Sequence, residues 1–397
     1  FTIPLLIGGA TTSRAHTALK IDPHYKSATI WVKDASRAVN VAQSLVSPGQ
    51  REAFVAANEA DYAEIRERHR RKDGGKRLVS LAHARAQRFD GGWADYVPPA
   101  PRQPGVTVFD DYPLGDLVEL IDWGPFFNAW ELAGRYPDIL DDAVVGPQAR
   151  ELFADAQAML RQVVDQKWLT AKAVVGFWPA NSVGDDVVLG DGTTLHFLRQ
   201  QADKPPERPD FCLADFIAPR DSGRQDWIGA FAVTAGIGIE PHLERFRADH
   251  DDYNAILLKA LADRLAETLA ERIHQRVRTD LWGYAADESL DAQALIDERY
   301  RGIRPAPGYP ACPEHSEKTT MFRLLDATTH AGITLTEHFA MYPAASVSGW
   351  YFSHPGSQYF VVGRVSKEQV ADYARRKGIG LQDAERLLAF NLDYDPE

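Results

Sequence analysis

Cysteine is almost absent from this 397-residue sequence, which contains only Cys212 and Cys312. Two cysteines are too few for a disulfide framework or for a cysteine-rich metal site. No pair of histidines has a zinc-like spacing with a third ligand nearby, so no bound metal is predicted. We expect a protein of a reducing compartment, with the cytoplasm as its location.

Long apolar runs and an excess of basic residues are also lacking. No run approaches the roughly 18–20 apolar residues that a bilayer span needs, so no membrane partner is expected. Lys and Arg number 44 against 56 Asp and Glu, which gives a net charge of −12. This balance disfavours binding to a phosphate backbone, and we expect no nucleic-acid partner and a monomeric chain. The apolar start, residues 1–10, has neither a basic segment nor an initiator Met, which is typical of a cut inside a longer protein.

Familiar catalytic motifs are missing as well: there is no P-loop, HExxH, CxxC or GxSxG pattern. The segment 236–241, GIGIEP, comes closest to a dinucleotide-binding loop. It lacks the third Gly and has a Pro where a helix should continue, so a strand-ending turn is the better interpretation. We therefore name no catalytic residue.

What the sequence does have is the composition of a folded protein, with 45% hydrophobic and 25% charged residues, and a length that suits two or three domains. Near the start, predicted strands at 3–7 and 29–32 alternate with predicted helices at 15–20 and 37–45, a pattern that indicates a parallel, doubly wound sheet. Two strands do not form a stable sheet alone, so residues 1–65, with the first part of a helix at 48–71, are interpreted as the end of a Rossmann-like α/β domain. A basic stretch and a proline-rich run then predict a linker over 66–105.

From residue 106 to 397, helix and strand signals mix without strict alternation, which predicts an α+β domain with an antiparallel sheet. Strands are expected at 174–178 and 226–234, a capped helix from Ser366 to about Gly378, and a short helix at 382–390. The segment 243–282 reads as one long helix whose apolar residues recur every four positions from Leu257 to Leu281. Asp263, Glu267 and His274 lie on the other side of this helix, where a solvated face is favoured over an acid/base or metal site.

Two clusters stand out as candidate binding segments. Residues 304–315 contain four prolines in ten residues, which predicts an extended loop that presents its peptide groups outward. Such a loop suits either a polar small molecule or a rigid connector. Residues 121–127 place Asp122 among aromatic side chains, where a carboxylate needs a cation from an Arg, a Lys or a ligand.

These segments together resemble the C-terminal third of cobalamin-dependent methionine synthases. The resemblance covers nearly the whole chain and rests on IPLLIGGATTSRAHTALKI, IDWGPFF, GFWPANSVGDD, CLADFIAP, HDDYNAILLKALADRLAE, RGIRPAPGYPACPEH and SVSGWYFSHPGSQYF. It implies that residues 1–46 end a Rossmann-like cobalamin domain and that residues 106–397 form a reactivation domain that binds S-adenosylmethionine. The family moves a methyl group from methyltetrahydrofolate to homocysteine through cobalamin, and reductive methylation restores oxidised cobalamin with an electron from flavodoxin or a related flavoprotein.

The resemblance also implies roles for individual residues. Asp122 would meet the ammonium group of S-adenosylmethionine and Arg304 its carboxylate, a pairing of one anion and one cation that suits a zwitterion. The other residues implied for this ligand are Ala306, Gly308, Tyr309, Tyr359 and Phe360. Those implied for the nucleotide tail of cobalamin are Gly8, Gly9, Ala10, Ala35 and Ser36. Three acids, Asp263, Glu267 and Glu298, match family positions at a domain interface and are assigned to conformational control.

The sequence departs from the family in what it lacks. The DxHxxG loop with the cobalt-ligating His is not found, and neither are the homocysteine, zinc and folate modules, so cobalamin binding is expected only together with the rest of its domain. Two alternatives stay open: a docking switch that holds S-adenosylmethionine and a flavoprotein without chemistry of its own, and an unrelated α+β enzyme.

A basic stretch is the candidate for steering an acidic flavodoxin-type partner to this protein, with a solvated linker as the alternative interpretation. It comprises Arg66, Arg68, Arg70, Arg71, Lys72, Lys76 and Arg77.

Overall fold

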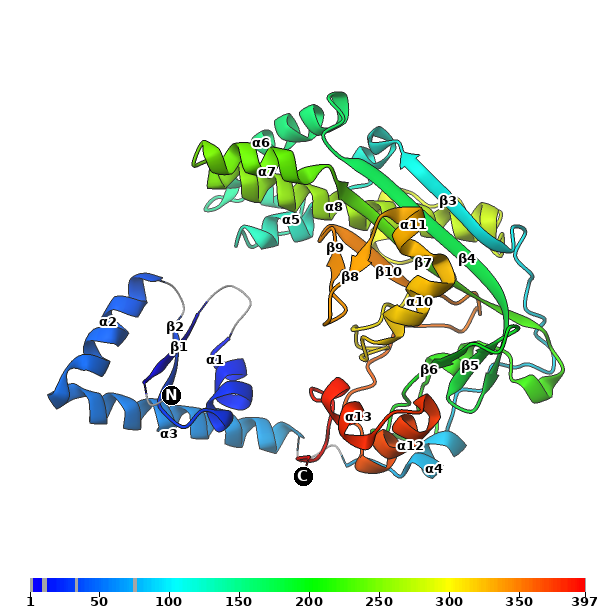
Figure 1. Ribbon diagram of the computed structural model, residues 1–397, viewed down its shortest axis with the longest axis horizontal. Coiled ribbons are helices and arrows are strands. Elements are labelled where there is room, and N and C mark those ends of the chain that lie inside the picture. Colours follow the sequence, from blue (N-terminus) through cyan, green and yellow to red (C-terminus); the bar gives the residue numbers. More distant parts are fainter. Residues whose placement is uncertain (1–2, 9–12, 33–34, 74–76, 397) are drawn as a thin grey trace. The chain divides into compact units, whose positions relative to one another are not determined.

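The computed structural model describes residues 3–8, 13–32, 35–73 and 77–396, and the chain divides into two compact units, 1–77 and 78–397 (Figure 1). Each unit has its own hydrophobic core. The two units are described separately below.

The first unit is a two-stranded parallel sheet with helices. Strands β1 (Leu5–Gly8) and β2 (Thr29–Val32) pair in parallel, as the alternation of strands and helices predicted. Buried residues of β2 and α2 form a small core. The helical segments are α1 (Arg14–His16), a π-helical turn (Thr17–Ile21), a 3₁₀ turn (Asp22–His24), α2 (Ala35–Val46) and α3 (Pro48–Asp73).

The linker expected over 66–105 is not found as such. Residues 66–73 continue helix α3, and residues 78–105 belong to the second unit. The backbone N–H of Val79 donates to Gln201 at 2.8 Å, Leu81 in helix α4 (Leu81–Ala86) is buried, and the indole of Trp282 donates to the carbonyl of Pro99 at 2.8 Å. Prolines at 98–104 do exclude regular structure, but this segment packs along a folded domain.

The second unit is built on an antiparallel sheet of six strands in the order β10-β7-β4-β5-β6, with β3 paired to β4. The long strand β4 pairs with β7 on one edge and with β3 and then β5 on the other. The expected strands at 174–178 and 226–234 lie inside β4 and β7. The strands are β3 (Gly105–Tyr112), β4 (Thr170–Val183), β5 (Asp186–Leu189), β6 (Thr194–His196), β7 (Asp226–Ile237) and β10 (Ser346–Tyr351), with a separate hairpin of β8 (Thr334–Leu335) and β9 (Met341–Tyr342).

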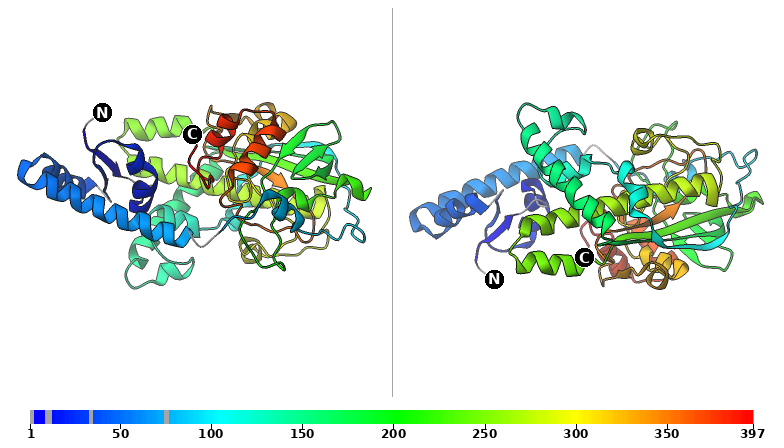
Figure 2. Two further views of the ribbon diagram at one scale, coloured as in Figure 1. Left: turned by 90° about the horizontal axis from the view of Figure 1, so that it is seen from below. Right: turned by 90° about the horizontal axis from the view of Figure 1, so that it is seen from above.

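Helices cover both faces of this sheet, and Figure 2 shows α8 on one side with α10 and α11 on the other. Alternation along β4 produces this arrangement, because Val175 packs in the core under α8 and Val174 in the core under α10. The α+β class is therefore confirmed. The helices not yet given are α5 (Gly124–Ala129), α6 (Gly146–Asp165), α7 (Ile239–Ala248), α8 (Asp252–Arg276), α9 (Ala292–Ile296), α10 (Glu317–Leu325), α11 (Ala327–Ala331), α12 (Lys367–Lys377) and α13 (Leu381–Leu387).

The segment 243–282 is not one helix as expected. Helix α7 ends at Ala248, His250 has a positive φ of 55°, and Asp251 caps α8 by accepting a hydrogen bond from the N–H of Asn254. Helix α8 then continues into a π-helical turn (Val277–Leu281). The apolar row from Leu257 to Leu281 is buried throughout, which confirms that part of the prediction.

His274 is buried and does not belong to a solvated face. Its ring stacks on that of Tyr351, with the centroids 5.0 Å apart, and burial holds its pKa well below the ordinary value. Residues four positions apart on a helix are offset by roughly 40° around its axis. The buried apolar row therefore winds around α8, and by position 274 it has reached the side on which His274 lies. Asp263 remains exposed and Glu267 is half-buried.

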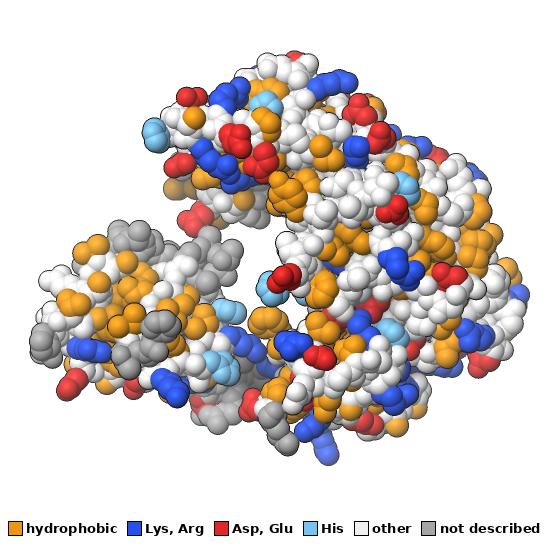
Figure 3. Space-filling model, in the orientation of Figure 1, with side chains coloured by type: hydrophobic (Ala, Val, Ile, Leu, Met, Phe, Trp, Pro, Cys, Tyr) orange, Lys and Arg blue, Asp and Glu red, His pale blue; other side chains and the backbone are white. Residues whose placement is uncertain are grey.

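In the described part of the chain, no helix is both long and apolar enough to cross a bilayer. On the face of the second unit visible in Figure 3, acidic and basic side chains are intermixed.

Candidate ligand site

Two adjoining cavities in the second unit hold most of the predicted ligand residues. A cavity of about 540 Å³ is lined by the proline-rich loop, β10 and residues 359–361, and one of about 380 Å³ lies between residues 120–125, α8 and α9. Glu267, Glu298 and Arg304 line both. The structure thus brings together segments nearly 240 residues apart in the sequence. The predicted residues that line at least one cavity are Asp122, Glu267, Glu298, Arg304, Ala306, Tyr309, Tyr359 and Phe360.

Arg304 lies at the junction of the two cavities and is held there by several groups. Its Nη1 donates to Glu271 Oε2 at 2.7 Å and to the hydroxyl of Tyr300 at 2.6 Å. The Arg304 side chain is only 18% exposed. Burial opposes its charge, but Glu271 together with Tyr300, Tyr359 and Tyr351 outweighs that effect and keeps the pKa of Arg304 above its ordinary value. A guanidinium fixed in this way can present its remaining N–H groups to a carboxylate.

Glu271, the carboxylate partner of Arg304, was not among the predicted residues. It lies one turn after Glu267 on α8, and a row of acids at four-residue spacing reads as a solvated face in the sequence. Burial raises its pKa, and the charges of Arg304 and Arg278 oppose that rise. Arg278, fully buried, lies 3.7 Å from Glu271 and stacks over the ring of Tyr300 at 4.0 Å. The site therefore rests on a largely buried network in which Glu271 joins Arg278 to Arg304.

Asp122 lies in the smaller cavity just before helix α5. Its Oδ1 accepts the backbone N–H of Gly124 at 2.9 Å, which fixes the side chain at the helix entrance. Among the residues that the structure describes, no Lys or Arg lies within ion-pair distance of this carboxylate. The cation that the sequence required for Asp122 is thus not supplied by the described protein groups.

The proline-rich loop is more tightly closed than predicted. The N–H of Gly308 donates to Cys312 O at 2.7 Å, and the N–H of Trp350 on β10 donates to Pro305 O at 2.9 Å. Several of its peptide groups are therefore paired instead of facing outward. Gly308 makes this possible through a φ of 97°, and a Cβ there would lie 2.1 Å from the imidazole of His315. Gly308 itself acts from within the loop and is not part of the cavity lining.

The predicted aromatic residues lie around the larger cavity in different ways. The hydroxyl of Tyr359 accepts the backbone N–H of Arg304 at 3.1 Å and so ties residue 304 in place. Tyr309 is largely exposed, at 61%. Phe360 stacks on Phe211, with centroids 5.6 Å apart, so its ring is fixed by the core beneath it.

The three predicted interface acids differ in their surroundings. Glu267 and Glu298 line both cavities, and burial, with Asp263 and Glu271 adding to it, raises the pKa of Glu267. Asp263 pairs with Arg264 at 2.5 Å and lines neither cavity. The acids of the site therefore exceed its cations, which favours a ligand with positive charge.

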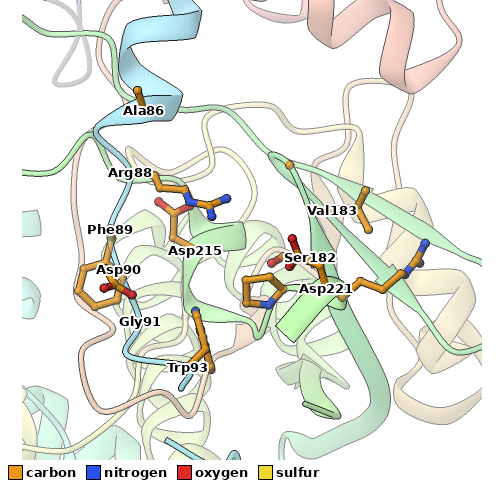
Figure 4. Close-up of a pocket in the computed structure, with 13 residues that line it drawn as sticks. Ala86, Arg88, Phe89, Asp90, Gly91, Trp93, Ser182, Val183, Asp215 and Asp221 are labelled. Carbon is orange, nitrogen blue, oxygen red and sulfur yellow. The ribbon is translucent and has the colours of Figure 1, made fainter. Parts of the chain in front are cut away.

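A further cavity, of about 660 Å³, lies elsewhere in the second unit and contains none of the predicted residues (Figure 4). Its acids and arginines are mixed, and both carboxylate oxygens of Asp215 are bound by buried Arg199. Figure 4 shows Trp93 and Phe89 on the irregular segment that follows helix α4, along one side of the cavity. We attribute this hollow to the packing of residues 86–93 against the β4–β5 hairpin. Among the described residues, no group of three or more His, Cys, Asp and Glu side chains is placed to hold a metal.

The residues predicted for cobalamin lie in the first unit. Gly8 ends β1, and a Cβ there would lie 3.1 Å from the carbonyl oxygen of Val32. Gly9 and Ala10 lie outside the described residues. Ala35 and Ser36 open helix α2 instead of forming the expected loop, and their side chains are not described.

The basic stretch is partly neutralised. Arg66 pairs with Asp22 at 2.7 Å and Arg68 with Glu64 at 2.8 Å. The side chains of Arg70, Arg71, Lys72 and Lys76 lie outside the described residues. Of the three cations whose side chains the structure describes, Arg66, Arg68 and Arg77, the first two are engaged within the first unit.

The second unit is similar to a known protein family and to a solved structure. Residues 113–378 match the family model of the vitamin B12 dependent methionine synthase activation domain. A crystal structure of the MetH reactivation domain bound to AdoHcy is similar to this chain, with 51% sequence identity and a TM-score of 0.78 over 80% of this chain and 99% of that one. The chain therefore belongs to the vitamin B12 dependent methionine synthase family, and its second unit carries the activation domain.

Proposed function

We propose that this chain binds S-adenosylmethionine in the two adjoining cavities and supports the reductive methylation of oxidised cobalamin. The observation that carries the proposal is that Asp122 and Arg304 line the same cavity. Asp122 has no cation partner among the described residues. The relative bound to AdoHcy supports it, because AdoHcy carries the same adenosine and amino-acid groups.

The smaller cavity fits the amino-acid end of the ligand. An ammonium group needs an anion, and a carboxylate needs a cation with N–H groups aimed at it. Asp122 and Arg304 line this cavity together. The surplus of acids contributed by Glu267 and Glu298 suits the extra positive charge of a sulfonium.

The larger cavity fits the adenosine. It is mostly apolar, with Pro305, Pro307 and Met341 in its walls, and it is fixed by the turn at Gly308. Apolar walls with a few polar groups are typical of nucleoside sites. The two cavities share Glu267, Glu298 and Arg304 in their walls, and we place one molecule across both.

The chemistry asked of the protein is mainly alignment. A sulfonium is already an activated methyl donor, so the protein needs to orient the methyl group and does not need a general base. Cobalamin, when bound by the complete enzyme, supplies the cobalt that accepts the methyl group. Within this chain, the network of Glu271, Tyr300 and Arg304 fixes one end of the donor.

We further propose a flavodoxin or related flavoprotein as the electron donor and the other modules of methionine synthase as partners. This part of the proposal rests on family membership. The alternative is a docking switch that binds the ligand without supporting methyl transfer. Joining the chain to an intact cobalamin domain and measuring methylation of cobalamin distinguishes the two.

Calorimetric titration with S-adenosylmethionine and AdoHcy tests the binding site. Asp122→Ala and Arg304→Ala should each weaken binding by about 2–4 kcal/mol, because each leaves a ligand charge unpaired in a partly buried cavity. Asp116→Ala is the matched control, since Asp116 is exposed on the 3₁₀ turn at Leu114–Leu120, close to Asp122 in the sequence. Equal affinity for all three variants and the parent would refute the assignment.

A further inference from the structure

Lys318 is a buried cation in the wall of the larger cavity, and neither the sequence analysis nor the family match gives it a role. It is 8% exposed and lies in the first turn of α10. It lines the larger cavity beside the proline-rich loop and does not line the smaller one. It therefore lies on the adenosine side of Arg304.

Three features of its position disfavour a positive charge. Burial lowers the pKa of Lys318, and the opposing effect of Cys312 does not offset it. The N-terminal turn of a helix repels cations because its N–H groups carry partial positive charge. No carboxylate of the described residues lies within ion-pair distance of Nζ. The neighbouring Glu314 and Glu317 are both bound by Lys377 instead.

The protein supplies Lys318 with neutral acceptors only. Nζ donates to Phe339 O at 3.1 Å and lies 3.4 Å from His315 Nδ1. An ammonium has three N–H donors, so one is left for another acceptor. A buried cation that the fold itself penalises, placed in the wall of a ligand cavity, indicates a contact with the ligand.

We propose that Lys318 is a specificity-determining residue that donates a hydrogen bond to an acceptor nitrogen of the purine ring. This inference rests on the proposed binding of S-adenosylmethionine. The charged groups of that ligand face Asp122 and Arg304, so Lys318 meets its neutral nucleoside part. Ring nitrogens of adenine are suitable acceptors in such an apolar cavity.

Titration of the full chain tests this with two ligands and two substitutions. Lys318→Met keeps the length of the side chain and removes the donor; Arg323→Met, exposed on the same helix, is the control. Lys318→Met should weaken AdoHcy and 5′-methylthioadenosine by the same factor, roughly tenfold to a hundredfold, because both contain the adenosine. Arg304→Ala should weaken AdoHcy alone, since 5′-methylthioadenosine has no carboxylate.

The melting temperature and deaza analogues separate this role from a structural one. If Lys318 serves the ligand, Lys318→Met should melt at the same temperature as the parent or higher, because a penalised buried charge is removed. The 1-, 3- and 7-deaza forms of AdoHcy each lack one acceptor nitrogen of the purine ring. The form that lacks the acceptor of Lys318 should bind weakly to the parent, and Lys318→Met should not weaken its binding further. Unchanged affinity in Lys318→Met, or an equal loss for AdoHcy and all three analogues, would overturn the proposal. Failure of the parent to bind AdoHcy at all would instead refute the proposed function.

Discussion

Asp226, at the start of β7, is a buried carboxyl group without a cation among the described residues. It is 2% exposed, and its two oxygens accept the backbone N–H groups of Ala218 at 2.8 Å and Trp227 at 2.7 Å. Burial outweighs these two hydrogen bonds and raises its pKa to about 7. The group is thus protonated more readily in the folded than in the unfolded chain.

This shift predicts a loss of stability with rising pH. Because the folded pKa lies above the unfolded value of 3.8, the contribution is complete below about pH 4 and is lost as the pH rises to about 7. Asp226→Asn cannot ionise and should remove this dependence, which amounts to at most about 1.4 kcal/mol per pH unit. Urea unfolding at pH 5, 6, 7 and 8 measures it. Curves of parent and variant that stay parallel, as expected for the exposed control Asp116→Asn, would contradict the assignment.

Some residues of the site could be predicted from the sequence and others could not. Asp122 lies among aromatic residues and Arg304 opens a proline-rich segment, and an isolated charge in such a segment indicates a binding residue. Glu271 and Lys318 lie on amphipathic helices, where a charged residue normally faces water. Their burial depends on which side of α8 and α10 faces the sheet and the loop, and that is a property of tertiary packing.

At the scale of elements, periodicity predicted the strands β4 and β7, and the Ser366 cap predicted helix α12. It failed at the α7–α8 break because the polar residues 249–252 do not interrupt the spacing of the apolar ones. The local signal for the break is Asp251, a side chain that caps a new helix. The turn in the proline-rich loop was also missed, since it depends on a hydrogen bond from Gly308 to Cys312.

Gly308→Ala tests whether this turn shapes the site. The added Cβ would meet the ring of His315, and the φ of 97° is unfavourable for alanine. We expect AdoHcy binding to weaken by roughly tenfold or more, since a displacement near 1 Å in a binding loop has effects of that order. Gly363→Ala is the matched control: its φ is 75° and nothing lies within 4 Å of the added Cβ, so it tests backbone strain alone. A loss of affinity as large in Gly363→Ala would show that the His315 contact is irrelevant.

At the scale of the whole molecule, residues 78–105 decide where the second unit begins. His354 lies against the rings of Phe89, Trp93 and Tyr96, with centroids 4.8–5.7 Å away, and its Nε2 donates to Gly91 O at 3.0 Å. These contacts join the early segment to the loop after β10. Such packing is not predicted from a proline-rich sequence, because prolines prevent regular secondary structure but do not prevent apolar contacts.

A truncation pair tests this boundary. A chain of residues 78–397 should fold and bind AdoHcy as the full chain does, because the second unit has its own core and contains both cavities. A chain that begins at residue 106 should unfold at least several kcal/mol more easily, since it exposes Trp282 and His354 and leaves the backbone groups of Leu281 and Gln201 unpaired. Thermal unfolding and AdoHcy titration of the three chains provide the comparison. If the chain from 106 is as stable as the chain from 78, residues 78–105 are a linker after all, and the packing around His354 contributes little to the fold.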